Sequence, residues 1–151
     1  MPCSYDIILW VQSGSERLPR RQAERVMLIQ ALLYRDERLQ GYDAAAVVEV
    51  IEHLDLARLA AFERVLFEAA RPGMVVLTTP NVEYNGRFPT LATGTMRHHD
   101  HRFEWTRSEF QRWADRVVAA YRYTYALHPL GREDGVVGAP SQMAVFSMAT
   151  A

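Results

Sequence analysis

The chain has 151 residues, of which 49% are hydrophobic and 23% are charged, as expected for a single globular domain. It contains neither a run of about 18 apolar residues nor a basic segment followed by an apolar one, so the sequence predicts no membrane span and no secretory signal. The net charge of −1 excludes polyanion binding by bulk electrostatics, and the single cysteine, Cys3, excludes an internal disulfide and fits a reducing cytoplasm.

In chain order, strands and helices alternate. Short apolar runs predict strands at residues 5–11, 26–29, 42–48 and 74–77. Apolar residues recur with helical spacing over residues 56–70, and Arg71-Pro72-Gly73 ends this helix. A second helix is expected after Thr106, because Glu109 three residues later completes a capping box. Weak alternation over residues 121–127 and an apolar run at 143–148 predict two final strands.

This order predicts an α/β fold with a mostly parallel sheet and right-handed crossovers. The last two strands have no helix between them, so we expect an antiparallel hairpin on one edge of the sheet. Residues 80–105 form the longest irregular stretch, and a loop of this length in a small domain is usually functional or disordered. Its aromatic residues favour an ordered, functional loop. Ligands of such sheets bind beyond the carboxyl ends of the strands, where this loop begins.

Two carboxylates and an imidazole follow the strand at residues 42–48, namely Glu49, Glu52 and His53. Their spacing would bring all three side chains to one face of a helical turn. The alternative is the acidic first turn of an ordinary helix, which explains the two acids but not the histidine.

A second cluster, His98-His99-Asp100-His101, lies in the long loop. The predicted sheet brings this loop and residues 49–53 to the same edge, which favours a metal site. Carboxylate and imidazole together suit manganese, iron or zinc. Glu49, Glu52, His53 and one loop histidine would leave two octahedral positions free, and two neighbouring hydroxyl groups could fill them.

Several motifs together give the chain a family resemblance. They are Gln30, residues 34–36 (YRD), 49–54 (EVIEHL), 79–85 (TPNVEYN) and 100–106 (DHRFEWT). With these residues the chain resembles, from about residue 16 to about 146, the small-RNA 3′-terminal ribose 2′-O-methyltransferases in their bacterial RNA-repair form. The joint presence of E-x-x-E-H, T-P-N-x-E-Y-N and H-R-F-E-W-T makes the resemblance specific.

The resemblance implies a class I, Rossmann-like methyltransferase sheet and methyl transfer from S-adenosylmethionine to the 2′-hydroxyl of the 3′-terminal ribose of RNA. It implies a manganese or magnesium ion that holds the terminal 2′- and 3′-hydroxyls. By motif match, its ligands would be Glu49, Glu52, His53 and His101. His53 would also help to remove the 2′-hydroxyl proton.

The resemblance implies further contacts and partners. Leu32 and Val48 would lie at the cofactor, and Asn81, Tyr84 and Arg102 would touch the splayed terminal nucleotide. The partners would be an RNA 3′ end and a polynucleotide kinase–phosphatase–ligase RNA-repair protein.

The amino-terminal part departs from the family pattern. No G-x-G-x-G precedes Val26, and Ala31-Leu32 stands where the family tends to have a Gly-Ser-like pair. We therefore expect residues 1–15 to be an atypical segment and residues 16–151 to be the carboxyl part of the catalytic domain. Such a chain would bind S-adenosylmethionine weakly or not at all, and a separate chain carrying the glycine-rich half would be a further partner.

Two other functions fit the same residues. A metal-dependent hydrolase would use a metal-bound water and no cofactor. A non-catalytic remnant would bind RNA ends or a partner protein through an unpaired sheet edge.

Overall fold

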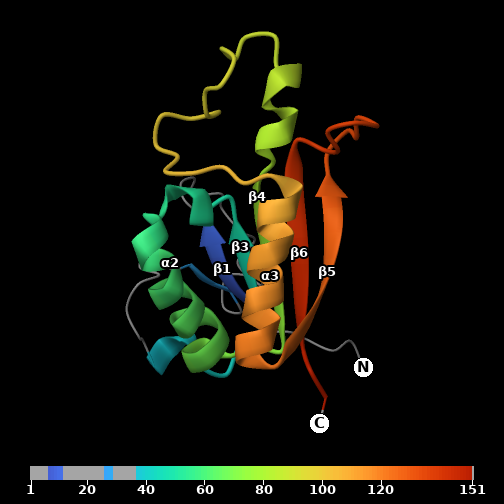
Figure 1. Ribbon diagram of the computed structural model, residues 1–151. Helices are drawn as coiled ribbons and strands as arrows, with labels where there is room; N and C mark the ends of the chain where they lie inside the picture. Colours follow the sequence, from blue (N-terminus) through green and yellow to red (C-terminus); the bar gives the residue numbers. More distant parts are fainter. Residues whose placement is uncertain (1–6, 12–25, 29–36, 151) are drawn as a thin grey trace.

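The structure is a computed structural model that describes residues 7–11, 26–28 and 37–150 (Figure 1). Its six strands form one sheet of order β2-β1-β3-β4-β6-β5. The strands are β1 (Ile7–Val11), β2 (Val26–Leu28), β3 (Ala44–Val48), β4 (Met74–Pro80), β5 (Tyr123–Leu130) and β6 (Ser141–Met148). The helices are α2 (Leu56–Glu63), which continues as a π-helix, η3 (Arg64–Ala70), and α3 (Arg107–Tyr121). Three 3₁₀ turns complete the elements: η1 (Glu37–Leu39), η2 (Ile51–His53) and η4 (Val82–Arg87).

The sheet has the predicted directions. β1 pairs in parallel with β2 and β3, and β3 pairs in parallel with β4. β6 lies between β4 and β5 and is antiparallel to both, which confirms the carboxyl-terminal hairpin. The chain passes from β1 to β2 on one side and to β3 on the other, so the strand order reverses between β1 and β3. This is the point at which open α/β sheets bind their ligands.

Strand β4 extends further than the sequence indicates. The apolar run ends at Leu77, but β4 continues to Pro80, because β6 pairs along its whole length, with Pro80 opposite Ser141. The predicted irregular stretch also contains the turn η4, and a bridge between Asn81 and Trp105 closes the loop that follows. The carboxyl end of β4 is therefore held from two sides.

Helices α2 and α3 cover the same face of the sheet (Figure 1). Large apolar side chains of both helices are buried against alternate residues of β4 and β6: Phe62, Leu66, Phe67, Phe110, Trp113, Val75, Leu77 and Phe146. The indole nitrogen of Trp113 donates a 2.7 Å hydrogen bond to Glu63 Oε1 and so joins the two helices. Full burial of one such side chain stabilises the fold by about 1.5–3 kcal/mol, so this layer holds the sheet firmly.

The start of α3 is fixed by the predicted capping box. The Thr106 hydroxyl accepts a 3.2 Å hydrogen bond from the Glu109 backbone N–H, and the Thr106 N–H donates a 2.8 Å bond to Glu109 Oε2. The long loop before Thr106 lies above the carboxyl ends of β3 and β4 (Figure 1). Within the described ranges, no helix combines the length and the apolar character needed to cross a membrane.

Candidate metal centre

Four residues at the carboxyl ends of β3 and β4 form what we call the candidate metal centre: Glu49, Glu52, His53 and His101. Glu49 follows β3 directly and has a φ of 51°, so it adopts the left-handed conformation. Its backbone N–H donates to the Thr78 hydroxyl at 3.1 Å and to the Thr78 carbonyl at 3.2 Å. The expectation that Glu49 belongs to a helical turn is therefore wrong, because β4 binds its backbone and the turn η2 begins only at Ile51.

A left-handed conformation is unfavourable for a residue with a side chain, by about 1–2 kcal/mol. Strain of this kind concentrates at functional sites. Glycine would remove the strain at this position, so the presence of Glu49 favours a role for its carboxylate.

Glu52 and His53 lie on η2, beside the end of β4. Glu52 is fully buried, and its Oε2 accepts a 3.1 Å hydrogen bond from the Thr79 hydroxyl. The backbone carbonyl of Glu52 accepts a 2.6 Å bond from the Arg102 N–H of the long loop. The loop is therefore bound directly to the turn that carries these side chains.

His101 comes from the long loop, as predicted. Its ring lies edge-on to the His53 ring, with 4.7 Å between the ring centroids. The ligand atoms of Glu52, His53 and His101 all lie within 4.8 Å of one another, close enough for one metal ion. Glu49 is outside this group, and its carboxylate interacts with the side chains of Thr78 and Ser141. The structure thus brings three of the four predicted ligands together and places the fourth beside them.

Burial dominates the electrostatics of the centre. It raises the pKa of Glu52 to about 8, and the charge of Glu49 adds to this effect. Burial also raises the pKa of Glu49. It lowers the pKa of His53, together with the charge of His101. Burial thus disfavours the charged form of each group, and a bound cation would compensate the two carboxylates.

The centre also contains polar atoms without partners. Among the described residues, the buried side-chain atoms that lack a hydrogen bond are Glu49 Oε1, Glu52 Oε1 and His53 Nδ1. Buried polar atoms are almost always satisfied, so three such atoms on neighbouring candidate ligands are unusual. Two carboxylates and two imidazoles form a donor set that suits a divalent ion such as manganese. The residues therefore fit the metal that the resemblance implies.

Glu104 supports the centre from behind, and the sequence analysis missed it. Its side chain is fully buried, and its Oε1 lies 2.5 Å from His101 Nδ1. It also accepts hydrogen bonds from the Arg97 N–H at 2.7 Å and from the Asn85 amide at 2.5 Å. A carboxylate on one ring nitrogen of a histidine fixes the tautomer that presents the other nitrogen to a metal. The H-x-x-E spacing within residues 101–104 is the signal that could have revealed it.

Arg97 anchors the loop that carries His101. Its guanidinium donates to the carbonyls of Asn81, at 2.8 Å, and Pro140, and to the Asn85 side chain at 2.8 Å. It also lies 5.0 Å from the centre of the Phe88 ring. Burial lowers the pKa of Arg97, while the carboxylates of the site, Glu104 foremost, oppose this change. This planar fork ties the loop to the residue that follows β4 and to the residue that precedes β6.

Asn81, one of the predicted RNA contacts, is part of the scaffold. It is 1% exposed, and its amide donates hydrogen bonds to the carbonyls of Val137 at 2.8 Å and Ala139 at 2.9 Å. Its side-chain oxygen accepts from the Glu83 N–H and caps η4. Both the nitrogen and the oxygen of the Asn81 side chain thus form hydrogen bonds within the protein.

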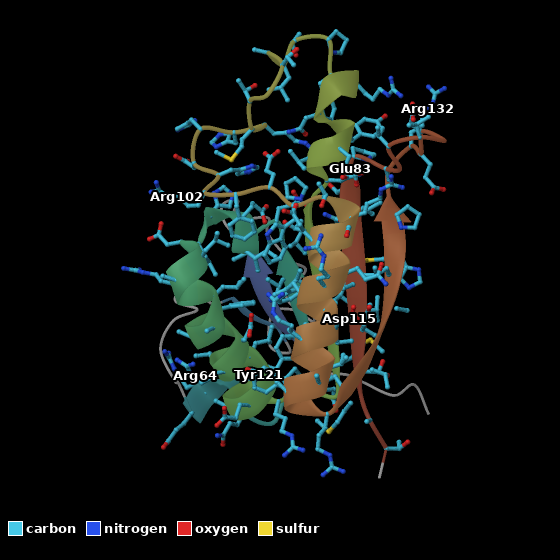
Figure 2. All side chains as sticks on the ribbon, in the orientation of Figure 1. Arg64, Glu83, Arg102, Asp115, Tyr121 and Arg132 are labelled. Carbon is cyan, nitrogen blue, oxygen red and sulfur yellow. The ribbon has the colours of Figure 1, made fainter. Side chains whose placement is uncertain are left out.

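Tyr84 and Arg102, the other two predicted RNA contacts, reach the surface. Tyr84 is partly buried against Phe88, with 5.4 Å between ring centroids. Arg102 is exposed, and its guanidinium lies 3.8 Å from the Asp55 carboxylate. Figure 2 shows Arg102 at the loop end of the molecule, far from Arg64. Of the predicted cofactor contacts, Val48 ends β3 and pairs with Val11 and Thr78, whereas Leu32 lies outside the described residues.

The chain is similar to proteins of one family. No protein-family model matches it. It is 44% identical over 121 residues to the small RNA 2′-O-methyltransferase of Rattus norvegicus, covering 77% of this chain and 29% of that protein. Two crystal structures of the methyltransferase domain of bacterial CtHen1 match with TM-scores of 0.73 and 0.76. They are 51% and 46% identical to this chain, and the matches cover 88% and 96% of it and 67% and 78% of the solved chains.

The match to the curated relatives is partial in length, since the chain spans about a third of each. A more distant structural neighbour comes from a structure described as the Pnkp1/Rnl/Hen1 RNA repair complex. It is 18% identical, has a TM-score of 0.65 and covers 95% of this chain, so it supports the fold alone.

Proposed function

Since the chain belongs to the small RNA 2′-O-methyltransferase family, we propose that it provides the acceptor side of an active site that methylates the 2′-hydroxyl of the 3′-terminal ribose of RNA. The observation that carries this proposal is the meeting of Glu52, His53 and His101 at the carboxyl edge of the sheet, with unpartnered atoms on Glu52 and His53. Neither an ordinary helix start nor a surface histidine cluster accounts for such atoms.

Glu49, Glu52, His53 and His101 would hold a divalent ion, manganese or magnesium. When bound, the ion supplies positive charge that lowers the pKa of a hydroxyl group in contact with it. S-adenosylmethionine would supply the methyl group. Thr79 and Glu104 orient Glu52 and His101 through the hydrogen bonds described above. The protein thus presents a preorganised set of oxygen and nitrogen ligands to the terminal ribose.

His53 is the group that we propose accepts the 2′-hydroxyl proton. Its lowered pKa keeps the ring neutral near pH 7, and a neutral imidazole has an unprotonated nitrogen that can take a proton. The His53 ring lies 4.7 Å from the His101 ring. One lone pair cannot hold an ion and accept a proton at once, so His53 would act as the base only while that nitrogen is not bound to the ion. Tyr84 and Arg102 remain the proposed contacts to the terminal nucleotide.

A methyl-transfer assay on short RNA tests the proposal. With a glycine-rich half that completes the cofactor pocket, RNA with a 3′-terminal ribose should accept radiolabelled methyl from S-adenosylmethionine in the presence of manganese, and RNA with a 2′-deoxy end or added chelator should not. His101→Ala should abolish transfer, whereas His128→Ala, which alters an exposed histidine on β5, should leave it unchanged. Transfer to the 2′-deoxy end would refute the acceptor, and release of phosphate without cofactor would favour the hydrolase.

The cofactor side of the proposal concerns the amino-terminal part. No G-x-G-x-G precedes Val26, so we propose that this chain by itself binds S-adenosylmethionine weakly and that a glycine-rich half completes the pocket. Calorimetry with the chain alone should detect little binding, and affinity typical of a complete methyltransferase would overturn this part. If the assay fails for this reason, manganese binding by the chain still tests the metal centre.

The partners can be inferred from one of the structural neighbours. One structural neighbour comes from a structure described as the Pnkp1/Rnl/Hen1 RNA repair complex. We propose that this chain likewise acts on RNA ends together with a kinase–phosphatase–ligase repair protein, in the cytoplasm. Co-purification of the chain with such a protein from its own cells would test the association.

A further inference from the structure

A second group of metal-binding side chains lies beside the candidate metal centre. It consists of His98, His99 and Asp100, which we call the loop cluster. One ligand atom from each residue lies within 4.8 Å of the other two. The turn that positions them is closed by a 3.2 Å hydrogen bond from the His101 N–H to the His98 carbonyl. The proposed function uses none of these three side chains.

The side chains of the loop cluster converge on Asp100. His99 Nε2 lies 3.0 Å from Asp100 Oδ1, and His98 Nδ1 lies 3.6 Å from Asp100 Oδ2. Among the described residues, the His98 Nδ1 atom also accepts a long hydrogen bond, of 3.3 Å, from the Asp100 backbone N–H. All three side chains are more than half exposed, so an ion and its water ligands could reach them from solvent.

The nearby guanidinium groups are directed away from the loop cluster. The guanidinium of Arg97 is directed to carbonyl groups and to Asn85, and that of Arg102 lies by Asp55. The ring of His98 is 5.8 Å from that of His101 and 6.4 Å from that of His53. The loop cluster therefore adjoins the candidate metal centre without sharing its ligands.

We propose that the loop cluster binds a second divalent ion, of the class that prefers imidazole: zinc, cobalt or nickel. The two sites differ in their donors. The candidate metal centre has two carboxylates among four ligands and suits manganese or magnesium, whereas the loop cluster offers two imidazoles and one carboxylate. Three protein ligands leave coordination positions open, as in metal sites that bind a further ligand.

Titration of the 151-residue chain with zinc, followed by calorimetry, tests the proposal. The wild-type protein should bind two zinc ions. The His99→Ala variant should bind one zinc ion. The affinity of the loop cluster for zinc should fall by at least 10- to 100-fold, which is the loss expected when only a supporting partner of a metal ligand is removed. His99 is 82% exposed, so its replacement should not disturb folding, and circular dichroism would check this. His128→Ala is the matched control and should bind two ions.

Two further measurements separate the sites. Glu52→Gln should lose the first site and retain the zinc ion that His99→Ala loses, so failure of the proposed metal centre would not hide the loop cluster. Cobalt should give an absorption spectrum typical of imidazole ligation in Glu52→Gln, and the added His99→Ala change should remove it. Binding of a single zinc ion by the wild type, or two by His99→Ala, would overturn the proposal.

Discussion

The Nδ1 atom of His101 lies 2.5 Å from the Oε1 atom of Glu104, whose side chain is shielded from solvent. A buried carboxylate at this distance keeps the proton on Nδ1 and leaves Nε2 free as a ligand. The two residues come from one short segment, but the contact depends on a loop that Arg97 holds against Asn81 and Pro140, next to the ends of β4 and β6. The orientation of His101 is thus set by the protein before any ion binds.

Replacing Glu104 with glutamine should weaken manganese binding by about 10- to 100-fold, because the His101 tautomer is no longer fixed by a charge. Calorimetry measures the affinity, and ¹⁵N NMR of the metal-free protein reports the His101 tautomer. Glu133→Gln, at an exposed position, is the control. An unchanged tautomer together with unchanged affinity would show that Glu104 only fills space.

The metal-free protein should lose stability as the pH rises from about 6.5 to 8.5. The pKa of Glu52 is raised from 4.5 to about 8, so the folded state binds more protons than the unfolded state between these values, and the free energy of unfolding falls with pH. The full effect, spread between pH 4.5 and 8, would be at most about 5 kcal/mol at 1.36 kcal/mol per pKa unit, and at most about 2 kcal/mol of it falls above pH 6.5. The raised pKa of Glu49 acts in the same direction.

The effect of His53 on stability has the opposite sign. Because its pKa is lowered in the folded protein, it reduces the free energy of unfolding only as the pH falls below 6.5, the pKa of histidine in the unfolded chain. Urea denaturation with chelator between pH 6.5 and 8.5 therefore isolates the carboxylates. Glu52→Gln should flatten the profile, and manganese should restore stability most at pH 8.5, where the ion replaces the lost proton. A profile that is flat in the wild type would contradict the burial of Glu52.

Changes at Glu49 should separate stability from metal binding. Glu49→Gly should be more stable than Glu49→Ala by about 1 kcal/mol, since only glycine adopts a positive φ without strain. Both variants should bind manganese more weakly than the wild type. Thermal denaturation gives the comparison, and Ala45→Gly within β3, expected to be destabilising, serves as the control. A less stable glycine variant would mean that the left-handed turn carries no strain.

Arg97→Lys should loosen the loop although it keeps the charge, because an ammonium group cannot reproduce the planar fork that reaches Asn81, Asn85 and Pro140. Faster limited proteolysis within residues 88–105 and weaker manganese binding are expected. Arg87→Lys is the control, since Arg87 pairs with Asp134 at the surface, where such pairs contribute about 0–1 kcal/mol. Equal proteolysis of wild type and Arg97→Lys would rule out the anchoring role.

Periodicity and capping signals were sufficient for much of the fold. The strands, both helices, the capping box at Thr106 and the terminal hairpin were all predicted from local pattern. The carboxyl end of β4 was not predicted, because residues 78–80 are polar or proline and form a strand only through pairing with β6. Tertiary pairing thus overrode local preference.

The candidate site was less predictable. Spacing alone suggested that Glu49 shares a helical turn with Glu52, whereas the backbone N–H of Glu49 donates its hydrogen bonds to Thr78, a residue 29 positions away. Glu104 could have been inferred from its spacing to His101, but its burial depends on Asn85 and Arg97. Long-range contacts of this kind have no signature in a single sequence.

The position of β6 between β4 and β5 has a consequence during synthesis. When β4 leaves the ribosome, more than sixty residues remain to be translated before its antiparallel neighbour can pair with it. Until then, one edge of β4 is open to other chains, and Ser141 is missing from beside Glu49. Pairing across such a separation is slow. The carboxyl end of β4, beside the candidate metal centre, is therefore fully paired only after residues 141–148 have been synthesised.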